Sequence, residues 1–145
     1  MRLNFEPEKE FKKENFKRLS GMIGCYVIFT NDVLIPYPNK STRVIYIGVS
    51  KTSSNGIKQR LESHLGGGNR GISNYSIKKG LKFTYQEADW LTELINRPAA
   101  DLERYLILDF AETYGCYPIC NARSEGELQN ESIDLEIDWE KFEKY

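Results

Sequence analysis

Residues 56–65 read Gly-Ile-Lys-Gln-Arg-Leu-Glu-Ser-His-Leu, and the rest of the chain is organised around this stretch. Ile57, Leu61 and Leu65 are spaced four apart, which is typical of a helix that turns one ridge toward a core. Arg60 and His64 lie one helical turn apart, beside that ridge. A guanidinium and an imidazole lose free energy when they are desolvated without partners, so we expect a cleft, an anion or a carboxylate to meet them. The alternative is that both side chains lean outward into water.

The composition is that of one soluble globular domain. A chain of 145 residues that is 40% hydrophobic and 28% charged can enclose a single core but is short for two. It contains no run of about 20 apolar residues, and its N-terminus lacks the apolar core of a signal peptide. Three cysteines leave one unpaired in any disulfide scheme, which favours reduced thiols. We therefore expect a cytoplasmic protein that does not associate with a membrane.

Charge is unevenly distributed along the chain, although the net charge is only −1. The segment 40–82 holds nine basic residues and one acid, whereas the segment 125–145 holds eight acids and two lysines. A basic stretch with glycines resembles the surface of a protein that binds a phosphate backbone, although solvated lysines are common on any protein. The candidate nucleic-acid-binding residues are Gly48, Lys51, Lys58, Arg70, Lys78 and Lys79.

Three segments have the composition of β-strands. Residues 22–30 and 43–49 are almost entirely apolar or β-branched, which favours strands buried on both faces, and the short connection over 31–42 makes them antiparallel neighbours. Residues 81–87 alternate apolar and polar side chains and predict a third strand. The other expected elements are helices over 7–19, 57–65 (ended by the glycines at 66–68), 72–79, 89–95 and 98–115, and a strand with an acidic face over 133–139.

A second polar residue in an apolar setting lies on the helix expected over 98–115. The exposed side of that helix is expected to carry Asp101, Arg104, Asp109 and Glu112. Glu103 is not on that side, because its neighbours one turn away are apolar. A lone buried carboxylate shifts its pKa upward unless a cation holds it. Two interpretations remain, an internal salt bridge with Arg60 or Arg104, or a ligand for a hard metal ion such as Mg²⁺.

Two tyrosines occupy equivalent places in the first two predicted strands. Gly24 and Tyr26 are two residues apart and share one face of their strand, and Tyr46 and Gly48 do likewise. If antiparallel pairing brings these faces together, two phenols lie beside two positions without side chains. Such a surface lets a helix or a phosphate approach the backbone closely. The simpler interpretation is that tyrosine is a good strand former.

Together, these residues resemble the GIY-YIG nuclease superfamily. The matching residues are, in order, Gly24-Cys-Tyr26, Tyr46-Ile-Gly48, Arg60, His64, Glu103 and Asn121. The chain departs from the family pattern in Cys25, where isoleucine or valine is usual, and in a longer connection between the first two motifs. We expect that longer connection to affect which substrate is bound rather than whether the site is catalytically active.

The resemblance covers residues 22–123 and implies an α/β (α+β) fold with a small three-stranded antiparallel sheet flanked by helices. Residues 1–21 would then be an N-terminal helical extension, 22–123 the nuclease domain, and 124–145 an acidic C-terminal extension packed on the same domain.

The activity implied by the resemblance is that of a metal-dependent endonuclease that hydrolyses phosphodiester bonds in DNA. Glu103 would bind the one divalent cation, Mg²⁺ or Mn²⁺, which would contact a phosphate oxygen and the leaving 3′ oxygen. Arg60 would hold the scissile phosphate, since its side chain stays cationic and its donors match phosphate geometry.

The remaining family positions imply roles in activating water. Tyr26 would be the general base, although about one phenol in a thousand is ionised at pH 7. Arg60 and His64 would therefore have to lower its pKa or pass its proton on. Tyr46 would orient the water or the phosphate, and Asn121 would hold the backbone of the site by hydrogen bonds.

Two other classes of function remain open. A catalytically inactive nucleic-acid-binding module of the same fold would have been favoured by loss of Glu103 or Arg60, and both are present. A protein-interaction domain would have to treat these polar residues as coincidental. The sequence does not distinguish DNA from RNA. Specificity could come from the added segments, a homodimer or a separate partner chain, and the acidic tail could extend a sheet, pair across a dimer or cover the basic face.

Overall fold

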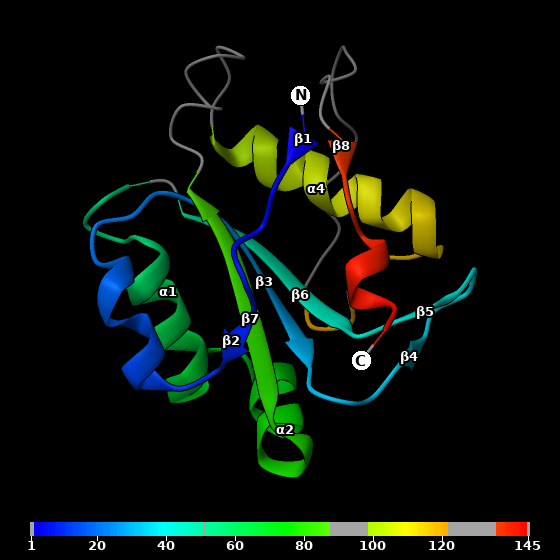
Figure 1. Cartoon of the computed structure of the whole chain (residues 1–145), viewed down its shortest axis with the longest axis horizontal. Coiled ribbons are helices and arrows are strands. Elements are labelled where there is room, and N and C mark those ends of the chain that lie inside the picture. The colour runs from blue at the N-terminus through cyan, green and yellow to red at the C-terminus, as the bar shows by residue number, and fades with distance from the viewer. Residues whose placement is uncertain (1, 51, 88–98, 122–135, 145) are drawn as a thin grey trace.

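The structure is a computed structural model that describes residues 2–50, 52–87, 99–121 and 136–144, without the side chains of 76–79 and 99–101. It is a mixed α+β fold with helices around antiparallel strands (Figure 1). The strands are β1 (Arg2–Leu3), β2 (Lys9–Glu10), β3 (Gly24–Thr30), β4 (Ile35–Pro36), β5 (Ser41–Thr42), β6 (Val44–Ser50), β7 (Leu81–Glu87) and β8 (Glu136–Ile137). The helices are η1 (Lys13–Leu19), α1 (Ile57–Ser63), η2 (His64–Gly68), α2 (Arg70–Lys79), α4 (Ala99–Tyr114) and η3 (Glu140–Phe142).

The central sheet is antiparallel and has the strand order β2-β7-β3-β6. The three long strands confirm the segments predicted from composition, and every residue of β3 and β6 is buried. The central sheet has four strands rather than the three predicted, because the N-terminal segment adds the short strand β2 to the open edge of β7. Pairing that edge satisfies backbone groups that would otherwise be a template for aggregation.

The N-terminal segment is therefore not the continuous helix predicted over 7–19. Its first part runs along β7, where Glu6 N donates to Tyr85 O (2.8 Å) and Phe11 N donates to Leu81 O (2.9 Å). Only Lys13–Leu19 is helical, as the 3₁₀ helix η1. Phe16 anchors this helix by packing edge-on against Phe83 of β7, with ring centroids 5.2 Å apart.

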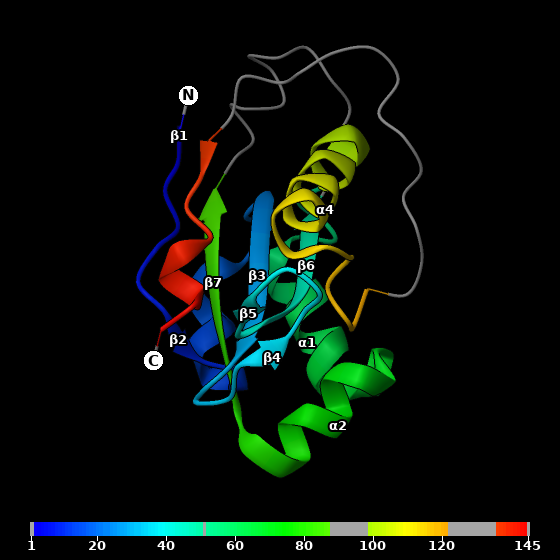
Figure 2. The ribbon, with the colours of Figure 1, turned by 90° about the vertical axis from the view of Figure 1, so that its right-hand side faces the viewer.

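The two faces of the sheet carry different elements. Tyr26, Tyr46 and Phe83 share one face through the pairs that β3 makes with β6 and β7, and η1 and α1 lie on that side. The other face carries Phe29, whose ring packs 5.0 Å from that of Phe142 in the C-terminal segment. Figure 1 shows α1 and α4 on different sides of the sheet, and Figure 2 shows β8 of the C-terminal segment beside β1.

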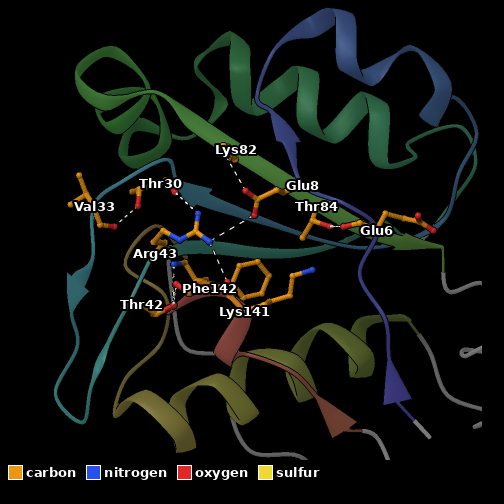
Figure 3. Close-up of polar contacts among 11 residues, drawn as sticks. Glu6, Glu8, Thr30, Val33, Thr42, Arg43, Lys82, Thr84, Lys141 and Phe142 are labelled. Atoms are coloured by element: carbon orange, nitrogen blue, oxygen red, sulfur yellow. Dashed lines mark hydrogen bonds and ion pairs between the residues drawn. The ribbon is translucent and has the colours of Figure 1, made fainter. Parts of the chain in front are cut away.

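Arg43 joins both ends of the chain to the sheet on the face away from α1. Its side chain is 2% exposed, and its guanidinium donates to Thr30 O (3.4 Å) and to Lys141 O (3.2 Å) (Figure 3). The Glu8 carboxylate lies 3.8 Å from the Arg43 guanidinium and 2.9 Å from Lys82 Nζ. Arg43 was counted with the basic segment 40–82, but it is buried and cannot contribute to a charged surface.

The described part of the acidic tail, residues 136–144, does not cover the face that carries Tyr26. Its strand β8 pairs in parallel with β1 in a separate two-stranded sheet. Of the strand predicted over 133–139, only Glu136–Ile137 is a strand among the described residues, and 133–135 lie outside them. The Trp139 indole donates to Asp109 Oδ2 (2.8 Å) on α4. Asp109 is thus half-buried, and its prediction as an exposed residue was wrong because the tail covers that side of α4.

The other predicted helices agree with the structure except at their ends. The glycines at 66–68 do not end the helix at once, since a π-helical turn, η2, follows α1. Leu65 lies in this turn and is exposed, so its prediction as part of the buried ridge was wrong. Gly67 then breaks it with φ +96°, a conformation that glycine adopts without strain. The helix predicted over 89–95 lies outside the described residues. Among the described residues, no helix is long and apolar enough to cross a membrane.

Candidate functional site

Tyr26 is at the centre of the candidate site and is completely buried. It faces Gly48 across the β3–β6 pair, and its ring lies directly over that glycine. A Cβ placed on Gly48 would be 2.3 Å from Tyr26 Cζ and 2.4 Å from its hydroxyl oxygen. The absence of a side chain at residue 48 therefore creates the space that the phenol occupies.

Arg60 and His64 both contact the Tyr26 hydroxyl group. Arg60 Nε donates to this oxygen over 3.0 Å, and His64 Nε2 lies 2.9 Å from it. Both side chains are half-buried and lie on the side of α1 next to the buried residues Ile57 and Leu61. The two side chains do not lean outward into water, and the partner that both of them contact is a phenol rather than the expected cleft, anion or carboxylate.

Tyr46 completes the aromatic part of the site. Its ring stacks on that of Tyr26, with centroids 6.1 Å apart and an interplanar angle of 27°. The His64 ring meets it edge-on, with centroids 4.7 Å apart. Two phenols, an imidazole and a guanidinium therefore share one small volume between the sheet and α1.

The helix α1 is fixed at its beginning by the chain before β3. Ile57 N donates to Met22 O over 2.9 Å, and a Cβ on Gly56 would come within 2.7 Å of the same oxygen. Because Met22 lies two residues before β3, the start of the helix is tied to the strand that carries Tyr26. This contact fixes the start of the helix that carries Arg60 and His64.

Burial controls the protonation of the site. It raises the pKa of Tyr26 well above its ordinary value, although Arg60 opposes this, and it also raises the pKa of Tyr46. The pKa of His64 falls to about 4, first through burial and then through the charge of Arg60. Both phenols and the imidazole are neutral at pH 7, so Arg60 does not by itself lower the Tyr26 pKa, as a general base at that position would need.

Arg60 remains cationic in this environment. Burial acts to lower its pKa, but the Tyr26 and Tyr46 phenols and the Glu103 carboxylate raise it above the ordinary value. A half-buried guanidinium with a secure charge is suited to hold an oxyanion such as a phosphate.

Glu103 lies on α4 close to these groups. It is half-buried, and its charge raises the pKa of Tyr26, Tyr46 and Arg60. The neighbours Leu106 and Ile107 are fully buried, as expected from the helical pattern. The helix α4 thus brings the Glu103 carboxylate near Tyr26 and Arg60, although α4 and α1 lie on different sides of the sheet.

The Asn121 side chain makes two hydrogen bonds to the backbone of β6. Its Oδ1 accepts from Ile47 N (3.1 Å), and its Nδ2 donates to Ile47 O (2.9 Å), which is the pairing that a neighbouring strand would make. Cys120 N donates to Ile45 O over 2.8 Å. These bonds bracket Tyr46 along the edge strand and confirm that Asn121 binds the backbone of the site.

Tyr37 supports the same edge and was not singled out from the sequence. Its hydroxyl donates to Val44 O (2.7 Å) and accepts from Ile119 N (3.1 Å). The residue lies in the connection between β3 and β6, which is long for the family that the sequence resembles. A tyrosine in a loop with two prolines carried no pattern that could have shown this role.

The candidate nucleic-acid-binding residues do not form one cluster with Tyr26. Gly48 lies beneath the phenol, and Arg70 is exposed at the beginning of α2. Lys58 lies in a groove between α1 and η1. Lys51 and the side chains of Lys78 and Lys79 are outside the described residues.

The site offers one carboxylate to a metal ion. Within the described ranges, no three His, Cys, Asp or Glu side chains come together as a ligand cluster. Mg²⁺, however, is commonly held by one or two carboxylates with water and phosphate oxygens as its other ligands. The placement of Glu103 beside Arg60 fits a cation of that kind.

Replacing Gly48 tests the packing of Tyr26. Gly48→Ala should lower the free energy of unfolding by about 1–3 kcal/mol, because the new methyl group forces the phenol out of its place. Urea denaturation measures the change. Gly66→Ala is the matched control, since nothing lies within 4 Å of its Cβ. Equal stability of the two variants would contradict the close approach of Tyr26 to Gly48.

The buried neutral state of His64 makes stability depend on pH. The unfolded chain takes up a proton near the ordinary pKa of 6.5, whereas the folded chain does so only near 4. Stability should therefore fall by about 1 kcal/mol between pH 7.0 and 5.5, where the carboxylates stay ionised. His64 is the one histidine in the chain, so His64→Gln should remove this dependence in urea denaturation. An unchanged dependence in the variant would show that His64 titrates normally when folded.

Comparisons of the chain with protein-family models, with curated proteins and with solved structures give no significant match.

Proposed function

We propose that the protein is a metal-dependent endonuclease of the GIY-YIG type that hydrolyses phosphodiester bonds in DNA. The observation that carries this proposal is the Tyr26 hydroxyl group, which is bonded at once to Arg60 and to His64. A phenol held between a guanidinium and a neutral imidazole combines an anion-binding group with a path for a proton. Phosphodiester hydrolysis needs both, because a water must be deprotonated while charge develops on the phosphate.

The order and placement of the elements support the same family. The motifs Gly24–Tyr26 and Tyr46–Gly48 lie on adjacent antiparallel strands, in register at Tyr26 and Gly48. The helix that follows β6 carries Arg60 and His64, and α4 brings Glu103 into their vicinity. Tyr46 on β6, Arg60 on α1 and Glu103 on α4 thus act electrostatically on one phenol, Tyr26.

Arg60 binds the scissile phosphate. It is half-buried, cationic and has donors beyond the Nε that contacts Tyr26. Guanidinium donors match the oxygens of a phosphate and stabilise the charge that these oxygens gain in the transition state. Loss of one such group typically costs about 10²- to 10³-fold in rate.

Tyr26 and His64 relay the proton of the attacking water. The raised pKa of Tyr26 excludes a free phenolate as the resting base at pH 7. In the relay, water gives a proton to the Tyr26 oxygen while the phenol proton passes to His64 Nε2, 2.9 Å away. The hydroxide attacks phosphorus, and the bond from phosphorus to the 3′ oxygen breaks. The leaving 3′ oxygen takes a proton from solvent water, and His64 returns its extra proton to solvent.

Substrate binding prepares His64 for this step. In the free protein, the charge of Arg60 is one of the two causes that lower the His64 pKa. A phosphate bound to Arg60 offsets that charge, so the imidazole becomes a better proton acceptor when substrate is present. Tyr46 orients the water through its position against Tyr26 and His64, and Asn121 keeps Tyr46 in place through the β6 backbone.

Glu103 holds the divalent cation. Its half-buried carboxylate lies near Arg60, which places it beside the phosphate that Arg60 would hold. When bound there, Mg²⁺ or Mn²⁺ would stabilise negative charge on the phosphate and on the leaving oxygen.

The second candidate function is a nucleic-acid-binding module of the same fold that does not cut. The complete burial of Tyr26 and its raised pKa favour this alternative, since both limit the contact of the phenol with water. Arg60 would then bind phosphate without a reaction. The two functions differ in whether a bond in DNA is broken.

Cleavage of supercoiled plasmid and of branched DNA tests the proposal. Purified protein should cut in Mg²⁺ or Mn²⁺ and not in EDTA, and Glu103→Gln and Arg60→Ala should each lower the rate at least about 100-fold. Glu112→Gln, on the exposed side of the same helix as Glu103, is the matched control and should cut normally. Binding of DNA without cutting by the wild type on every substrate would instead support the non-cutting module.

A further inference from the structure

A basic groove lies between η1 and α1, the two helices on the left of Figure 1. It is open and has a volume of about 470 Å³. Its lining residues are Lys12, Lys13, Glu14, Lys17, Lys58 and Glu62. Four lysines against two glutamates leave the groove with a net positive charge.

The groove and the Tyr26 site flank the same helix. With 3.6 residues per turn, Lys58 and Glu62 lie on one side of the buried ridge of α1, and Arg60 and His64 lie on the other. The helix η1 that forms the far wall of the groove packs through Phe16 on the sheet face that also carries Tyr26. The groove and the site thus belong to one side of the protein.

Three lysines of the groove differ from several cations elsewhere on the protein. Arg2, Lys40, Arg43 and Lys82 each lie within 4 Å of a carboxylate. Lys12 is paired with Glu10, 3.0 Å away. In contrast, Lys13, Lys17 and Lys58 have no ion pair in the part of the chain that the structure describes. These three lysines beside α1 thus carry positive charge without an ion pair, in excess of the two glutamates that line the same groove.

The width of α1 determines how many nucleotides would separate a phosphate at Arg60 from one at Lys58. A helix with its side chains is about 10–12 Å wide, and one DNA strand advances about 3.4 Å per nucleotide. A backbone that crosses α1 from the Arg60 side to the Lys58 side therefore passes over about three nucleotides.

We propose that the groove between η1 and α1 binds the DNA backbone about three nucleotides from the phosphate held by Arg60. This inference rests on the proposed nuclease function and makes the N-terminal extension part of the substrate-binding surface. Lys13 and Lys17 contact phosphates from η1, and Lys58 contacts them from α1. None of these contacts reads a base, so they contribute affinity and orientation rather than sequence preference.

The experiment measures DNA affinity at several salt concentrations in EDTA, so that no cutting interferes. A fluorescein-labelled 20-bp duplex is titrated by anisotropy with wild type, Lys13→Gln/Lys17→Gln and the control Lys40→Gln/Lys144→Gln. The control also removes two positive charges, but beside the C-terminal segment. The groove variant should bind more weakly, with the slope of log K against log salt reduced by about 2. The control should match wild type. All four lysines are exposed, so the variants should fold, which thermal unfolding checks.

The outcomes separate this inference from the proposed function. The proposal that the groove binds DNA would be wrong if the groove variant kept the wild-type salt slope, or if the control lost as much DNA affinity as the groove variant. Either result would count against the groove even if wild-type protein cuts plasmid. A reduced slope in the groove variant alone would support the groove even if wild type proves unable to cut DNA. Absence of wild-type binding at low salt would also overturn it.

Discussion

The close contact between Tyr26 and Gly48 is the constraint on which the site depends. A phenol lies flat over a strand only where the facing residue has no side chain, and at Gly48 even a methyl group would overlap the ring. Once the ring is held there, its hydroxyl group projects toward α1, where Arg60 and His64 meet it. The same burial that fixes the phenol also raises its pKa, so the geometry that organises the site makes the resting phenol a poor base.

The remainder of the fold keeps this arrangement rigid from two sides. On the free edge of β6, Asn121 and Cys120 bond to the backbone on either side of Tyr46, which takes the place of a further strand. On the face away from α1, Arg43 ties Glu8 and the C-terminal segment to the sheet. The described part of the tail, residues 136–144, is thus secured on the face away from the Tyr26 side.

Much of this organisation could be predicted from sequence, where a local pattern determines the structure. The apolar runs of β3 and β6 and the Ile57 and Leu61 ridge have one favourable environment, so their burial follows from composition and spacing. The contact of Arg60 and His64 with a shared partner follows because polar groups beside such a ridge need one. The pairing of β2, the burial of Arg43 and the bond between Trp139 and Asp109 join residues far apart in the chain, and no local pattern encodes them. The pKa of Tyr26 likewise depends on the depth of burial, which spacing does not reveal.

The most direct test of the account is the cleavage rate of Tyr26→Phe at saturating DNA and Mg²⁺. Tyr85→Phe is the matched control, because Tyr85 faces Tyr26 across the β3–β7 pair and is less buried. The proton relay predicts a rate at least about 100-fold below wild type for Tyr26→Phe, with DNA affinity unchanged, and a normal rate for Tyr85→Phe. A Tyr26→Phe protein that folds, binds DNA and cuts at the wild-type rate would contradict the account.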